Sequence, residues 1–187
     1  DVEIDLQTPE DKNIILIGGK NGYGKTNFLI SIVWCLYGEK ITQIDESFKR
    51  EVQKEINYQK FIKQSLNWNS REENNSDFSV EIYFEEIDYP ASLKVSDKKI
   101  IIKRIFNIDK IEEELSILNS HGNELFSELE DKLSFINDYL IPLEAAKFVF
   151  FDAEKIASWA ELSTKDEGNV LNDALGKLFG LEFYENI

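Results

Sequence analysis

Residues 19–26 read GKNGYGKT, and this stretch decides the fold. It matches the phosphate-loop (P-loop) pattern G-x-x-x-x-G-K-[ST], which requires a strand before it and a helix after it. The apolar, β-branched run at 13–17 predicts a central buried strand. Beyond the loop, apolar residues recur at the spacing of one helix face, at Leu29, Ile32, Val33 and Leu36. The residues on both sides therefore predict a strand–loop–helix unit, with Gly38 as the left-handed cap of the helix.

Each position of the loop suits a phosphate ligand. Glycines allow the backbone to curl until successive N–H groups point at one phosphate, and the following helix adds its positive end. Lys25 would reach the β- and γ-phosphate oxygens, and the Thr26 hydroxyl would bind Mg²⁺. A plain glycine turn between a strand and a helix would not require Lys-Thr at its end. The predicted site for Mg-ATP comprises Gly19, Lys20, Asn21, Gly22, Tyr23, Gly24, Lys25, Thr26 and Asn27.

Composition limits the other functions. The 187 residues carry a formal net charge of −15, which argues against a protein that coats nucleic acid through excess Lys and Arg. A single cysteine permits no internal disulfide, and with a single histidine it leaves no zinc site of the usual type. No apolar run approaches the ~20 residues that span a bilayer, and no signal segment opens the chain. We therefore expect a cytoplasmic protein without a membrane partner.

The middle of the chain alternates like a half-buried sheet. Residues 78–84 alternate apolar with polar side chains, and further β segments are expected at 100–106 and 115–118, with a turn at 120–123. These segments predict an antiparallel meander. A strand is also expected at 2–6, weak helices at 43–66 and a loop at 67–76.

Two further helices and one strand are expected toward the end of the chain. Ser127 would cap a helix that ends at Pro142, and residues 170–178 would form the last amphipathic helix. Residues 147–152 read as a buried strand that ends in Asp152. That carboxylate fits either a Walker B aspartate, with Glu154 as catalytic base, or a residue that caps a helix.

Four stretches resemble one family of SMC-like ABC ATPase heads, the DndD family linked to DNA phosphorothioation. They are residues 13–22, Cys35-Leu36-Tyr37-Gly38, Phe150-Phe151-Asp152-Ala153-Glu154-Lys155-Ile156, which is similar to the signature F-F-D-G-E-K-I, and residues 175–181. The likeness implies an α/β P-loop fold: the N-terminal lobe of an ABC/SMC-type head, with a mixed sheet and an antiparallel β part. A single lobe would cover residues 1–187, with a helical arm at about 153–187 leading to a coiled coil outside the chain.

The same resemblance implies roles and partners. It places Asp152 in the Q-loop, where it would sense Mg²⁺ through water, and assigns Walker B and the signature motif to a C-terminal lobe. ATP would drive dimerisation with a second head, and the partners would include DNA-modification proteins and DNA itself. Two alternatives stay open: a self-sufficient P-loop NTPase with Asp152 as Walker B, such as a kinase, and a scaffold lobe that binds nucleotide without turnover.

Overall fold

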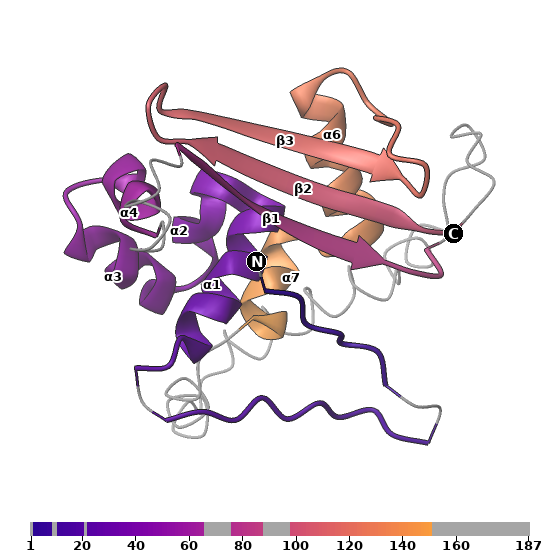
Figure 1. Ribbon diagram of the computed structural model, residues 1–187, viewed down its shortest axis with the longest axis horizontal. Coiled ribbons are helices and arrows are strands. Elements are labelled where there is room, and N and C mark those ends of the chain that lie inside the picture. Colours follow the sequence, from indigo (N-terminus) through magenta and orange to yellow (C-terminus); the bar gives the residue numbers. More distant parts are fainter. Residues whose placement is uncertain (1, 9–10, 21, 66–75, 88–97, 151–187) are drawn as a thin grey trace, which may run out of the picture.

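The computed structural model describes residues 2–8, 11–20, 22–65, 76–87 and 98–150. Its helices and strands, in chain order, are α1 (Lys25–Tyr37), η1 (Gly38–Lys40), α2 (Ile41–Ile44), α3 (Glu46–Lys54), α4 (Tyr58–Gln64), β1 (Asp77–Phe84), β2 (Ile100–Asn107), β3 (Glu112–Asn119), α6 (Leu129–Phe135), the π-helix η2 (Ile136–Leu140) and α7 (Leu143–Val149). Figure 1 shows the sheet with helices packed against one side of it.

The predicted antiparallel meander is confirmed. The strands lie in the order β1-β2-β3, both pairs are antiparallel, and each pair joins eight residues of one strand to eight of the next. Alternation sets the face: on β2, Ile100, Ile102, Arg104 and Phe106 are buried, while the residues between them are half-buried. The third strand is longer than residues 115–118, and the expected turn follows it at 120–122.

The core lies between this face of the sheet and α1. The C-terminal half of α1 is buried from Val33 to Tyr37 and packs against β1 and β2. Helices α2, α3 and α4 extend the core through Ile41, Phe48 and Ile62, and α6 packs against β3. The predicted helix after the P-loop is therefore confirmed, and its apolar stripe is the central element of the core.

The strands predicted at 2–6 and 13–17 are wrong for this structure. Both segments are extended but form no ladder, and their apolar side chains are exposed, with Ile14 and Leu16 at 85% and 92%. Figure 1 shows them as an arm outside the helices and the sheet. The described residues contain one sheet, and it is wholly antiparallel, so they supply no neighbouring parallel strand that could bury residues 13–17 on both faces.

Two expectations near the C-terminal end of the described chain need correction. Residues 147–149 belong to helix α7, not to a buried strand, because Ala145 and Ala146 of the same helix pack into the core. Glu128 rather than Ser127 precedes α6, and neither its side chain nor another caps that helix. Asp152, Glu154, the arm at 153–187 and most of the 67–76 loop lie outside the described residues.

Candidate nucleotide site

Two glycines in left-handed conformations shape the P-loop before α1. Gly22 has φ 84° and Gly24 has φ 86°, a region that side-chain-bearing residues rarely adopt. Between them, the Tyr23 N–H donates to the Lys20 carbonyl at 3.2 Å and closes a turn. A Cβ atom added at Gly22 or Gly24 would meet nothing within 4 Å, so backbone conformation alone accounts for glycine at these two positions.

The first turn of α1 leaves its N–H donors without a side-chain acceptor. Gly24 precedes the helix, no side chain caps it, and the first turn contains no acidic residue. The first N–H groups of a helix have no partner within it, and they carry the positive end of the helix dipole. This end of α1 therefore suits an anion.

The Lys25 side chain folds back over the start of the loop. Its Nζ donates to the carbonyls of Gly19 at 2.7 Å and Lys20 at 3.0 Å, and the residue is exposed. The ammonium thus lies beside the loop backbone, where it adds positive charge to the uncapped helix end. Thr26 and Asn27 are exposed on the same first turn, and Tyr23 is 76% exposed.

The structure brings together only part of the predicted site. Gly19, Lys20 and Gly22 to Asn27 lie in one loop and one helical turn, whereas Asn21, Asp152 and Glu154 lie outside the described residues. Thr26 presents the hydroxyl oxygen that Mg²⁺ prefers as a ligand. In the part of the chain that the structure describes, no group of three or more His, Cys, Asp or Glu side chains could hold a metal ion.

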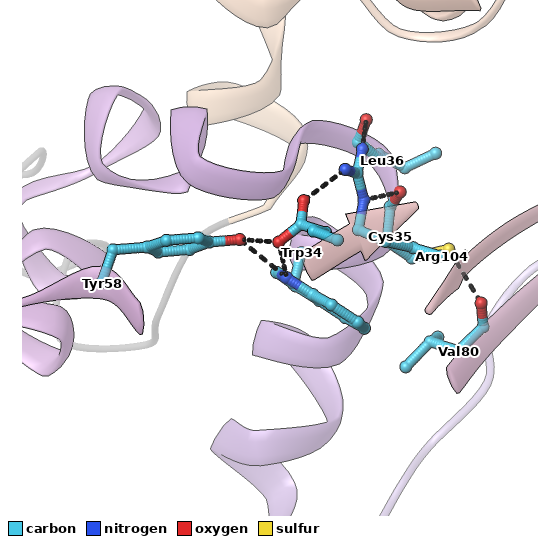
Figure 2. Close-up of polar contacts among 7 residues, drawn as sticks. Trp34, Cys35, Leu36, Tyr58, Val80 and Arg104 are labelled. Carbon is cyan, nitrogen blue, oxygen red and sulfur yellow. Dashed lines mark hydrogen bonds and ion pairs between the residues drawn. The ribbon is translucent and has the colours of Figure 1, made fainter. Parts of the chain in front are cut away.

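The opposite end of α1 is held by a buried arginine that the sequence analysis missed. Arg104 of β2 is 5% exposed, and its Nε and Nη2 donate to the carbonyls of Cys35 and Leu36 at 2.9 Å and 3.3 Å (Figure 2). These are among the last carbonyls of the helix, which have no partner within it. In the sequence, Arg104 occupies one of the alternating positions of 100–106 that are otherwise apolar, and this pattern could have revealed a buried arginine.

Glu113 of β3 fixes this guanidinium. Its Oε1 pairs with Arg104 Nη1, while its Oε2 accepts hydrogen bonds from the Tyr58 hydroxyl and, at 3.3 Å, from Trp34 Nε1. Trp34 Nε1 also donates to the Tyr58 hydroxyl at 2.9 Å. Burial raises the pKa of Tyr58 above its usual range, and the adjacent Glu113 carboxylate raises it further. The cluster therefore joins α1, α4 and two strands.

Gly38 makes room for this ion pair where α1 ends. A Cβ atom there would lie 2.6 Å from Glu113 Oε1 and 2.7 Å from Arg104 Nη1. Its φ of 55° has the sign expected of a C-terminal glycine, although its ψ of −129° lies outside the left-handed helical region predicted for it. Glycine is required here both by the backbone and by the close approach of two charged side chains.

Cys35 is fully buried beside the same arginine. Its Sγ lies 3.3 Å from the Val80 carbonyl (Figure 2). It also lies 3.5 Å from the Ile102 carbonyl, so the thiol can donate toward the sheet. Burial raises the pKa of the Cys35 thiol to about 12, against a smaller lowering by Arg104. The side chain therefore serves as a small core group, and a thiolate is disfavoured there.

Comparisons with known proteins agree with this geometry. The model of a family described as AAA domain matches residues 1–182. One solved chain, from work on the structural biochemistry of ATP-driven dimerization and DNA-stimulated activation of SMC ATPases, superposes with a TM-score of 0.52 at 15% sequence identity. The match covers 88% of this chain and 85% of that chain, and at this identity it indicates a shared fold. No curated protein sequence matches the chain.

Proposed function

The chain belongs to the AAA domain family, and we propose that it is the ATP-binding N-terminal lobe of an SMC-like ATPase head. Its fold is that of a P-loop NTPase with an antiparallel β part. The observation that carries the proposal is the position of Lys25, whose ammonium lies beside a glycine loop at the uncapped N-terminus of α1. Backbone N–H groups, the helix dipole and the ammonium would act together there on a bound anion.

In this proposal the P-loop binds Mg-ATP from one side. Lys25 binds the β- and γ-phosphates, and Thr26 contributes its hydroxyl to Mg²⁺, which neutralises the phosphate oxygens when bound. Asp152 would be the Q-loop residue that helps to hold Mg²⁺, and Glu154 follows it two residues later in the sequence. Hydrolysis also needs a positioned water and charge stabilisation on the far side of the γ-phosphate. That second surface would come from another lobe.

The exposed arm supports a C-terminal lobe as the missing partner. Residues 13–17 form an apolar, β-branched run, yet Ile14 and Leu16 are exposed and the segment pairs with no strand. Such a run is stable in a sheet only when neighbours satisfy its backbone groups and cover its side chains. We propose that strands of a C-terminal lobe of the same ATPase complete the sheet around this arm.

Two finer features of the proposed function rest on similarity to known proteins. Dimerisation driven by ATP and activation stimulated by DNA describe the SMC ATPases of the structural neighbour, and we extend both to this chain. A role in phosphorothioate-linked DNA modification or restriction rests on the four stretches that resemble the DndD family. The proposed cytoplasmic location rests on the apolar pattern of the sequence, in which no run approaches the ~20 residues that span a bilayer. Because the chain carries a net charge of −15, contacts with DNA would have to come from a local basic patch or a partner protein.

Replacing Lys25 tests the site directly. Lys25→Ala should abolish Mg-ATP binding by calorimetry without lowering the melting temperature, because the side chain is exposed and, within the described residues, its hydrogen bonds go to two loop carbonyls. Lys49→Ala is the matched control, since Lys49 is an exposed lysine whose ion pair with Glu46 lies on α3. Unchanged affinity in Lys25→Ala would remove this residue from the site.

A second experiment separates a half-head from a self-sufficient enzyme. The chain alone should bind ATP but release no phosphate above background, because its single phosphate-facing surface leaves the γ-phosphate in solvent. Adding the C-terminal lobe in trans should restore turnover, and only when Lys25 is intact. Turnover by the chain alone, lost in Glu154→Gln, would instead establish the self-sufficient enzyme.

A further inference from the structure

We propose that Arg104 is a positioning residue for the phosphate-binding helix, which it anchors from the end opposite the P-loop. The inference rests on the proposed function, since it concerns the same nucleotide site. The observation behind it is that α1 is buried toward its C-terminal end, with Ile30 already in the core, and is exposed where it meets the P-loop. Residues 25–27 are exposed, whereas residues 33–37 are buried. Whatever holds the buried end therefore determines where the exposed end lies.

Arg104 is suited to this task by its shape. One guanidinium donates to the Cys35 and Leu36 carbonyls and still has Nη1 directed at Glu113. A planar fork with fixed donor directions can satisfy two carbonyls and a carboxylate together, whereas a lysine ammonium is a point charge on a flexible stem. The positive charge also lies at the negative end of the helix dipole.

The anchor is itself held in place. Glu113 receives hydrogen bonds from Tyr58 on α4 and from Trp34 on α1, so its carboxylate is not free to rotate away from Arg104 (Figure 2). The Arg104 backbone is fixed in the central strand, between β1 and β3. In addition to its apolar packing on the sheet, helix α1 is thus connected to β2, β3 and α4 through this polar cluster.

Because α1 is long, a small tilt at its C-terminal end produces a larger displacement of its N-terminal end at the P-loop. The helix has 13 residues, which at a rise of about 1.5 Å span roughly 20 Å. A tilt of about 5° about the anchored end would displace the other end by roughly 1.7 Å for a helix of that length. Catalytic groups lose function when misplaced by about 1 Å, so a change of this size would matter for phosphate binding.

The test compares two buried cations. Arg104→Met removes the anchor, while Lys132→Met is the matched control. Lys132 is 8% exposed, donates to the Leu115 carbonyl at 2.8 Å and pairs with Glu124. Leu115 lies opposite Arg104 in the β2–β3 register, but the hydrogen bonds of Lys132 in the described residues go to β3 and Glu124, not to Arg104, Glu113 or α1. Both variants should unfold at lower temperature than the wild type, because each loses the bonds of a buried charge.

Only Arg104→Met should change the nucleotide site. Calorimetry with Mg-ATP, at a temperature where both variants are folded, should show affinity reduced about fivefold or more for Arg104→Met, the lower end of couplings typical between two sites. Lys132→Met should bind Mg-ATP as the wild type does. Hydrogen exchange should show faster exchange of the hydrogen-bonded α1 amides, from Phe28 onward, in Arg104→Met alone.

Glu113→Gln keeps the experiment decisive if Arg104→Met does not fold. It leaves the arginine in place but removes the charge that orients it, so Mg-ATP affinity should fall in the same direction. Wild-type affinity in a folded Arg104 or Glu113 variant would overturn the inference, as would an equal loss in Lys132→Met. If the wild-type chain itself binds no Mg-ATP, the proposed function fails instead.

Discussion

Gly38→Ala should be far more damaging than an alanine at another glycine of positive φ. The new Cβ would lie 2.6 Å from Glu113 Oε1 and 2.7 Å from Arg104 Nη1, closer than real Cβ contacts allow. The backbone cannot retreat easily, because the Gly38 N–H donates to the Trp34 carbonyl at the end of α1. The ion pair must therefore separate, or the helix end must move.

The expected loss has two parts. A side-chain-bearing residue at the backbone angles of Gly38, φ 55° and ψ −129°, lies in a sparsely populated region and costs about 1–3 kcal/mol. Breaking a buried ion pair costs about 3–5 kcal/mol when one charge loses its partner, and a displaced pair loses part of that. A total of about 3–6 kcal/mol follows, which for a chain of this size lowers the melting temperature by roughly 6–24 °C.

Gly122→Ala separates these two parts. Gly122 has φ +79°, and a Cβ there would meet nothing within 4 Å, so only the backbone part of about 1–2 kcal/mol applies. Thermal unfolding followed by circular dichroism, together with urea titration, would measure both variants. Equal destabilisation of Gly38→Ala and Gly122→Ala would refute the role of the ion pair at the helix end.

Three other predictions concern single side chains. Cys35, with its pKa raised to about 12 by burial, should resist thiol reagents at pH 8 in the folded chain and react only after unfolding, as a colorimetric thiol assay would show. Hydrogen bonds from Lys103, first, and from Tyr83 lower the pKa of Glu81 below its usual 4.5. The ionised carboxylate therefore stabilises the fold above pH 4.5, and this contribution is lost as the pH falls through the lowered pKa. Glu81→Gln should consequently flatten the acid side of a curve of stability against pH. Asp152→Asn should leave ATP binding largely intact and weaken Mg²⁺-dependent head closure, whereas loss of all Mg²⁺ dependence in an Mg²⁺ titration with a fluorescent ATP analogue would indicate Walker B.

Elements set by local pattern were predicted well from the sequence. Strict alternation at Phe78, Val80, Ile82 and Phe84 predicts a half-buried strand, and β1 alternates exposed with half-buried residues. The helix after the P-loop was predicted equally well, because its apolar residues follow the helical period and a glycine ends it. In both cases the pattern lies within one short segment, so the strand or the helix can be predicted without knowledge of contacts with distant residues.

Short apolar runs were predicted poorly, because period alone does not distinguish a buried strand from a buried helix. Residues 147–149 form the end of α7, where the packing of Ala145 and Ala146 decides in favour of a helix. Residues 13–17 show the converse: a β-branched run becomes a strand only when a neighbour pairs with it, and the described residues supply none.

The P-loop follows from the sequence alone, because glycine conformation, Lys25 and the start of α1 all lie within eight consecutive residues. What holds the far end of that helix was decided only by the tertiary structure. Arg104 lies 69 residues from Cys35 in the chain, and only the pairing of β2 with β3 brings it together with Glu113. An arginine among the buried apolar positions of a strand indicates that an acidic or polar group must pair with it, because a buried charge without a partner is costly. The sequence does not show which group this is, because that depends on packing between distant segments.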